Sequence, residues 1–193
     1  MNLSIMEWNI NQRSGFENGK IPLWIADEIQ NHEIVVLTEF YRTSNVREFL
    51  DKAFAGYIYK ITENPINQND VLIAIKDKFE YLSHEIATSE KTNNIPNYLR
   101  LDCKIEGNIF TIVGARIRVK EPKERYEQMK FIIEKLKGVK NPIVIAGDFN
   151  NYRRGTTQKD WSLSKLDELL GKEFKRYTPP GSSIFEDMIG ISY

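Results

Sequence analysis

Ile143-Val-Ile-Ala-Gly-Asp-Phe-Asn150 carries the strongest single signal in this 193-residue chain. Its first part, Pro142-Ile-Val-Ile-Ala146, is a short continuous apolar run, which is typical of a β-strand covered on both faces. The turn Gly147-Asp148-Phe149-Asn150 follows directly. Because functional side chains often gather in loops beyond strand ends, Asp148 and Asn150 are candidate site residues.

Two other polar groups follow predicted apolar strands in the same way. Asn9 and Asn11 come at the end of a predicted strand over Leu3–Asn9, and Glu39 comes directly after one over Glu33–Thr38. Strands that end at one sheet edge bring distant residues together there. Carboxylate and amide oxygens suit Mg²⁺, and Asn can also donate N–H groups to phosphate. A metal held in this way polarises a phosphoryl oxygen and lowers the pKa of a bound water.

The remaining chain predicts one mixed α/β domain over residues 1–193. Helices are expected from Pro22 onward, at Asn45–Phe54, at Lys123–Leu136 and at Ser162–Leu170. Further strands are expected at Tyr57–Thr62, Asp70–Lys76, Phe79–Ser83, Tyr98–Ile105, Ile109–Val119 and Ile184–Ile191. The β-α-β start and the hairpin-rich middle favour a layered α/β architecture.

Composition bounds the function only loosely. The chain is 41% hydrophobic and 28% charged, and its 27 basic and 27 acidic residues cancel. A neutral chain neither indicates nor excludes nucleic acid as a substrate. The single cysteine, Cys103, forbids an intrachain disulfide and fits a strand of the core. The sequence has no run of about 18 apolar residues, so no membrane span is expected. A cytoplasmic location follows by default. No feature of the sequence indicates an obligate protein partner.

Three ordered segments resemble motifs of the endonuclease/exonuclease/phosphatase superfamily, which includes DNase I-like nucleases. They are Trp8-Asn9-Ile10-Asn11, Val36-Leu-Thr-Glu39 and Ile145-Ala-Gly-Asp148-Phe-Asn150. The resemblance covers nearly the whole chain. It implies a four-layered α/β (α+β) sandwich, with two packed mixed β-sheets flanked by helices. It also implies a metal-dependent phosphoester hydrolase, of nuclease type in our expectation, whose metal-assisted water attacks without a covalent enzyme intermediate.

The resemblance also assigns roles to residues. Glu39 would be the principal ligand of Mg²⁺, or of Mn²⁺ in its place, with Asn9 assisting at the metal or the phosphate. Asn11 stands where the family often has an acid, and we place it beside the metal. Asp148 would position the attacking water, and Asn150 would contact the phosphate. The structural alternatives are turn formation by Asp148 and Asn150 and an ion pair of Glu39 with Arg42.

Two positions depart from the family pattern. Arg116 stands where a His or Tyr often contacts phosphate; its planar fork can do the same, or it can form a structural salt bridge. Asp187 resembles the acid that orients a catalytic histidine. That histidine belongs to a later Asp-His motif, which the sequence up to Tyr193 lacks, and we therefore expect a domain that is incomplete at its C-terminus.

The missing motif leaves three explanations open. The chain is a fragment of a longer protein, a truncated form with little activity, or a domain whose site another group completes, such as Arg116 or a partner subunit. The alternatives to a nuclease are therefore an inactive domain that binds phosphate or nucleic acid, and a phosphatase for soluble or lipid head-group phosphates. The loops Gln12–Lys20 and Thr88–Pro96 would carry the substrate specificity.

Overall fold

The structure, a computed structural model, describes residues 3–10, 20–63, 69–88, 94–118, 122–150, 169, 174–177 and 189–192. Its helices are α1 (Trp24–Ile29), α2 (Val46–Ala53) and α3 (Pro122–Leu136). Its strands are β1 (Ile5–Asn9), β2 (Ile34–Phe40), β3 (Tyr57–Ile61), β4 (Asp70–Lys76), β5 (Glu80–Ala87), β6 (Asn97–Ile105), β7 (Asn108–Arg116), β8 (Ile143–Asp148), β9 (Phe174–Tyr177) and β10 (Ile189–Ser192).

The strands form two mixed sheets. The first has the order β1-β2-β4-β3, and the second has the order β5-β6-β7-β8-β10-β9. The pairs β1/β2 and β7/β8 are parallel, whereas their other neighbours run antiparallel. The two parallel pairs matter for function because each brings two strand ends to the same edge of its sheet.

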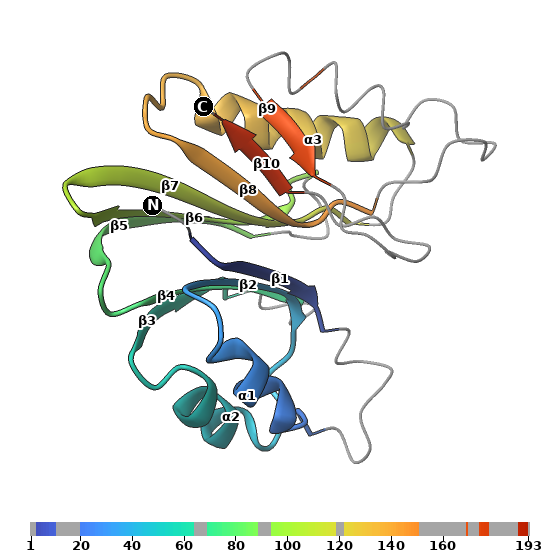
Figure 1. The fold of residues 1–193 in the computed structure, drawn as a ribbon. Coiled ribbons are helices and arrows are strands. Elements are labelled where there is room, and N and C mark those ends of the chain that lie inside the picture. The colour runs from blue at the N-terminus through green and yellow to red at the C-terminus, as the bar shows by residue number, and fades with distance from the viewer. Residues whose placement is uncertain are drawn as a thin grey trace.

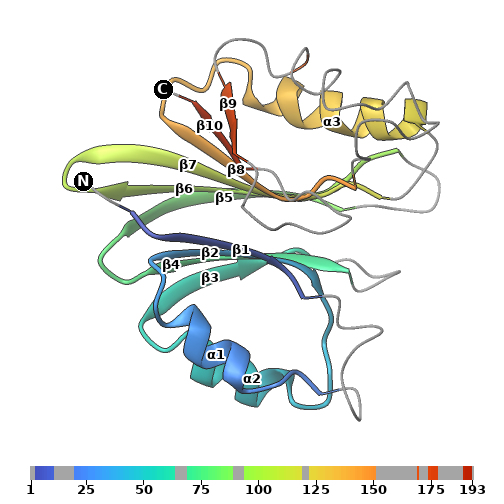
Figure 2. The same ribbon diagram turned by 45° about the vertical axis from the view of Figure 1, so that its right-hand side comes forward.

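The sheets pack face to face, with α1 and α2 covering the outside of one and α3 the outside of the other (Figure 1). The view in Figure 2 shows the same succession of helix, sheet, sheet and helix. The alternation of side chains along β2 explains its unbroken apolar sequence: Val35 and Leu37 pack toward the helices, while Ile34 and Val36 pack toward the second sheet. This confirms the four-layered sandwich.

The interface between the sheets is apolar and tightly packed. Its buried side chains come from both sheets, among them Val36, Ile73, Leu99 and Ala146. A Cβ at Gly114 would lie 2.6 Å from a methyl carbon of Val71 in the opposite sheet, so the absence of a side chain allows this close approach. The rigid contact fixes the strand ends of one sheet relative to those of the other.

The predicted elements are found with some changes in extent. Strand β5 runs to Ala87 rather than ending at Ser83, and β9 was not predicted. The predicted helix 162–170 lies outside the described residues apart from the helical Leu169, and so does most of the predicted strand 184–191. Cys103 is buried in β6 as expected, and burial raises the pKa of its thiol to about 12. No described helix is long and apolar enough to cross a membrane.

Candidate functional site

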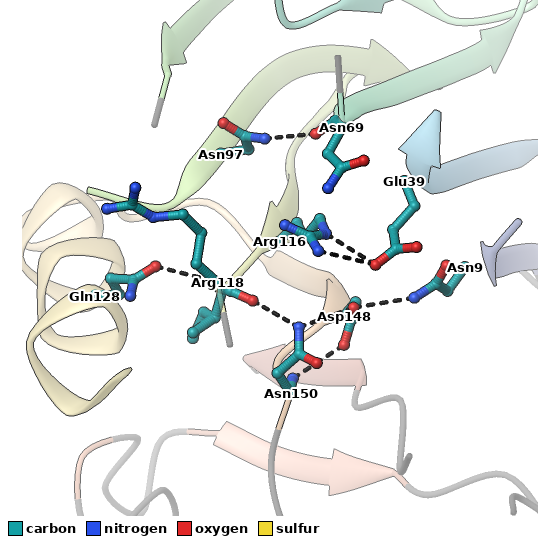
Figure 3. A network of polar contacts seen from close by, with 10 residues as sticks. Asn9, Glu39, Asn69, Asn97, Arg116, Arg118, Gln128, Asp148 and Asn150 are labelled. Carbon is teal, nitrogen blue, oxygen red and sulfur yellow. Dashed lines mark hydrogen bonds and ion pairs between the residues drawn. The ribbon is translucent and has the colours of Figure 1, made fainter. Parts of the chain in front are cut away.

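Strand ends from both sheets meet at one edge of the sandwich. In the first sheet, Asn9 at the end of β1 pairs in register with Thr38 of β2, and β4 begins opposite Phe40. In the second sheet, Arg116 at the end of β7 lies opposite Asp148 at the end of β8. Strand β6 begins beside the same Arg116. The polar side chains of both sheets therefore face a common region (Figure 3).

Asp148 is the most firmly held group of the site. The residue is 3% exposed, and N–H donors converge on its carboxylate. The Asn150 main-chain N–H donates to Oδ1 at 3.0 Å, and the Asn150 Nδ2 donates to Oδ2 at 3.0 Å. The Asn9 Nδ2 donates to Oδ2 at 3.0 Å from the other sheet. The carboxylate thereby ties the two sheets together at this edge and keeps a fixed orientation.

The backbone around Asp148 takes a turn that few residues could follow. Gly147 has φ 147°, and a Cβ there would stand 2.0 Å from the carbonyl oxygen of Ala115. Asn150 has φ 47°, a left-handed conformation that Asn tolerates better than most residues. Its Nδ2 also donates to the carbonyl of Ile117 at 2.6 Å. The side-chain amide of Asn150 thus donates once within the turn, to Asp148, and once to the segment that follows β7.

Glu39 is held differently, by a single cation from the opposite sheet. Both Nε and Nη2 of Arg116 donate to Glu39 Oε1, at 3.1 and 2.9 Å. The Glu39 and Arg116 side chains are only 15% and 12% exposed, respectively. Glu39 lies within β2, not after it as predicted, at a bulge where its φ is 53°. A bulge re-aims a side chain, and this one directs Glu39 toward the edge.

Arg42 does not pair with Glu39, although the two residues are close in sequence. Its Nε lies 3.7 Å from the buried Asp70 carboxylate, and its Nη2 lies 3.7 Å from Glu63. Thr62 Oγ1 also donates to Asp70, at 3.1 Å. Arg42 and Asp70 therefore form a second polar cluster beside Phe40, and Arg116 alone among the described cations pairs with Glu39.

Two buried amides of the site were not predicted from the sequence. Asn97 begins β6 directly opposite Arg116, and its Nδ2 donates to the main-chain oxygen of Asn69 at 2.5 Å. Asn69 is 4% exposed, and its Oδ1 has no hydrogen-bond partner among the described residues. Figure 3 shows its side chain pointing toward the Arg116–Glu39 pair. The only available signal was the position of both amides at strand starts.

Helix α3 supports the edge from the outside. The Arg118 main-chain N–H donates to Oε1 of Gln128 at 3.0 Å, which fixes the chain just after β7. Burial lowers the pKa of the Arg118 guanidinium; Glu124 opposes this shift, and the neighbouring cation Arg116 adds to it. Through Gln128, helix α3 holds the segment just after Arg116 in place.

The structure brings together five of the predicted site residues: Asn9, Glu39, Arg116, Asp148 and Asn150. Asn11 and Asp187, predicted as a metal neighbour and as an orienting acid, lie outside the described residues. The described part of the chain contains no cluster of three or more His, Cys, Asp or Glu side chains that could hold a metal.

A Mg²⁺ site does not require such a cluster, because this ion takes most of its six oxygens from water and phosphate. Glu39 offers such a ligand: its Oε1 accepts both bonds from Arg116, and its Oε2 accepts none from the described residues. Asn9 adds an amide from the neighbouring strand. The donor set fits a hard divalent cation with few protein ligands.

A groove of about 880 Å³ opens between α2 and the two edge strands β3 and β5, and none of the five site residues lines it. Phe40, which follows Glu39 in sequence, lines it. Tyr59 and Ile86, which are 37% and 39% exposed, line it as well. Its charged lining is mixed, with Arg42, Arg47 and Lys60 beside Asp51 and Glu63.

The sequence profile of the Endonuclease/Exonuclease/phosphatase family matches residues 6–185. The chain belongs to this family, whose members are hydrolases that act on phosphoesters. Comparison of the sequence with curated proteins gave no match.

Solved structures of the same fold share little sequence with the chain. The catalytic domain of human Nocturnin with a bound sulfate anion has a TM-score of 0.73 and 18% identity, over 98% of this chain and 82% of its own. The mannosyl-6-phosphatase Bt3783 of Bacteroides thetaiotaomicron has a TM-score of 0.73 and 16% identity, over 99% of this chain and 85% of its own. D. rerio TDP2 complexed with a single-strand DNA product has a TM-score of 0.70 and 15% identity, over 98% of this chain and 83% of its own. At these identities the likeness establishes the DNase I-like fold alone.

Proposed function

We propose that the chain is a Mg²⁺-dependent phosphodiesterase of nuclease type. One observation carries the proposal: Asp148, anchored by Asn9 from the other sheet, shares an edge with the Glu39–Arg116 pair. An anionic oxygen ligand, a phosphate-binding cation and a fixed carboxylate are the parts that in-line phosphoryl displacement requires. The solved TDP2 complexed with a DNA product supports the choice of a nucleic-acid substrate.

The chain's own residues divide the work as follows. Glu39 and Asn9 would hold the cation, which when bound polarises a phosphoryl oxygen and acidifies a water. Arg116 binds a phosphate oxygen through its fork of N–H donors. Asp148 orients the attacking water and accepts its proton. Asn150 acts through Asp148, because its side-chain amide donates to Asp148 and to the Ile117 carbonyl and so holds the turn in place.

The groove beside Phe40 offers room for the part of a substrate that flanks the scissile phosphate. Its exposed Tyr59 provides a face on which a base or sugar can stack. Arg47 and Lys60 suit neighbouring phosphates. We expect Tyr59→Ala to raise KM for an oligonucleotide and to leave KM for a small aryl phosphodiester unchanged. An equal change in KM for both substrates would show that the nucleic-acid base does not stack on Tyr59.

The proposal is tested by Mg²⁺-dependent hydrolysis of plasmid DNA, RNA, abasic DNA, a sugar phosphate and an aryl phosphodiester. Glu39→Ala and Asp148→Ala should each lower the rate by roughly 10²- to 10⁴-fold, as loss of a single acid–base group or metal ligand does. Glu80→Gln is the matched control, because this exposed carboxylate of β5 pairs with Lys104 away from the site. Activity that survives both site substitutions would refute the assignment.

The same panel separates the alternatives. Turnover of the sugar phosphate alone would favour a phosphatase, a possibility supported by the likeness to the mannosyl-6-phosphatase. Tight oligonucleotide binding without turnover, in a protein that folds normally, would favour an inactive binding domain.

A further inference from the structure

The Glu39–Arg116 pair has an asymmetric geometry. Two N–H groups of one guanidinium converge on a single carboxylate oxygen, although a side-by-side fork that used both oxygens is the stronger arrangement. The pair is largely shielded from solvent, so its charges neutralise each other more effectively than a surface pair would. The guanidinium of Arg116 therefore supplies at Glu39 the positive charge that a bound metal cation would supply.

Asn69 supplies an acceptor without a donor in the same region. Only 4% of its surface is exposed, and its Oδ1 lacks a partner among the described residues. Buried acceptors of this kind are rare in native proteins and are costly when left unpaired. The Asn97 amide fixes the Asn69 backbone, so the chain cannot simply carry the acceptor out to solvent.

Arg116 carries several donors at the same edge of the sandwich. It lies opposite Asn97 in the β6/β7 register, and Figure 3 places its guanidinium between the Asn69 side chain and the rest of the site. A guanidinium carries five N–H donors, of which Glu39 uses two, one on Nε and one on Nη2. For Arg116 to donate to Asn69 instead, its long side chain would move and the Asn69 amide would turn so that Oδ1, rather than the nitrogen drawn nearer to Arg116 in Figure 3, faces the guanidinium.

We propose that Arg116 has two partners, and that Asn69 is the positioning residue for the second. In the metal-free protein Arg116 pairs with Glu39. When Glu39 turns to a divalent cation, Arg116 moves to Oδ1 of Asn69 and presents its remaining N–H groups to the substrate phosphate. This inference rests on the proposed function, because it requires Glu39 to be a metal ligand.

Two consequences distinguish this arrangement from a fixed salt bridge. Arg116 competes with the metal for Glu39, so its removal tightens metal binding. Asn69 accepts a hydrogen bond from Arg116 when Glu39 is bound to the metal. Removal of Asn69 therefore weakens metal binding only while Arg116 is present. A coupling between Asn69 and Arg116 that exists in one ligation state can be measured by a double-mutant cycle.

The experiment is calorimetric titration of the full chain with Mn²⁺ and with Mg²⁺. Arg116→Met should tighten binding about tenfold, and Asn69→Leu should weaken it about fivefold. In the Arg116→Met background, Asn69→Leu should have no effect. Arg42→Met is the matched control, because it removes a neighbouring cation that pairs with Asp70 rather than with Glu39. Asn69→Ala replaces Asn69→Leu if thermal melting shows that the leucine variant does not fold.

The outcomes separate the two proposals. If Glu39→Gln does not reduce metal binding, the proposed function fails at its metal site. If binding depends on Glu39 but Asn69→Leu has the same effect with and without Arg116, the two-partner arrangement fails and the function stands. If Arg42→Met tightens metal binding as much as Arg116→Met does, the effect of Arg116 is only that of a nearby positive charge. This result would also overturn the inference.

A second readout follows the side chain itself. The Nε–Hε resonance of Arg116 in a ¹⁵N-labelled protein reports its hydrogen-bond partner and needs no substrate turnover. Saturating Mg²⁺ should shift this resonance in the native chain, and Asn69→Leu should alter the position of the metal-bound resonance alone. An Arg116 resonance that does not respond to Mg²⁺, in a protein that binds Mg²⁺ through Glu39, would show that the arginine stays in place.

Discussion

The two acidic groups of the site, Asp148 and Glu39, differ in how they are buried and in how their oxygens are hydrogen-bonded. Asp148 is almost fully buried and accepts N–H bonds twice from Asn150 and once from Asn9. Glu39 is partly exposed, and one cation, Arg116, holds one of its oxygens. Asp148 is therefore set by the fold before any ligand arrives, whereas Glu39 can exchange its partner. A single site can therefore combine a rigid carboxylate with an adjustable one.

The local chain explains the contrast. The rigid group lies in a turn in which Gly147 and Asn150 adopt backbone angles available to few residues, and side chains two residues apart close the network. The adjustable group lies at a β-bulge, and its partner comes from a strand 77 residues later in the sequence. Two of the bonds to Asp148 are made inside its own turn, whereas both bonds from Arg116 to Glu39 come from the opposite sheet.

The largest expected effect comes from breaking the turn at Gly147. In Gly147→Ala, the new Cβ would meet the Ala115 carbonyl oxygen 2.0 Å away, at a φ that alanine avoids. The β7/β8 pair would have to separate, so we expect a loss of at least about 3 kcal/mol in the free energy of unfolding. Urea denaturation followed by circular dichroism measures this loss.

Gly138→Ala is the matched control, because Gly138 also has a positive φ but no atom lies within 4 Å of the position that a Cβ would take there. It should cost about 1 kcal/mol, the conformational term alone. Equal losses in the two variants would mean that the close approach at Ala115 contributes nothing to the rigidity of the Asp148 turn.

A smaller effect is expected from Asp148→Asn. The amide keeps one acceptor, but its NH₂ group must face either the Asn150 N–H or the two donors on Oδ2. At least one buried donor then loses its partner, which costs about 2 kcal/mol. The unfolding free energy, measured by denaturation without metal, should fall accordingly. An unchanged stability would show that the network is weaker than its geometry suggests.

Much of the fold could be predicted because its signals are local. The apolar run before Asp148 and the alternation of apolar faces in β2 are set by burial on both sides, which leaves a mark in any short window of sequence. The turn after β8 carries its own chemistry in the adjacent Gly147 and Asn150. The family resemblance then placed Asn9, Glu39 and Arg116 around the same edge, and the structure brings them there.

The remaining features depend on contacts that sequence order hides. The partner of Glu39 is the distant Arg116 rather than the nearer Arg42, because a β-bulge redirects the carboxylate across the edge. Asn69 and Asn97 also meet only when two sheets pack together. A polar residue at a strand start looks like an ordinary turn residue until that packing is known.

The smallest effect is expected from Glu39→Gln, and it completes the contrast with Asp148. The amide oxygen of Gln still accepts from Arg116, so the variant loses only the difference between a charged and a neutral acceptor, and the metal-free stability should fall by about 1 kcal/mol. The response to Mg²⁺ should change instead. At a concentration near ten times Kd, a bound ion stabilises a protein by about 1.4 kcal/mol, and this gain should vanish in the variant. Thermal melts with and without Mg²⁺ measure both quantities. A large metal-free loss in Glu39→Gln would make Glu39 a structural group like Asp148, and the division into a fixed and an adjustable acid would not hold.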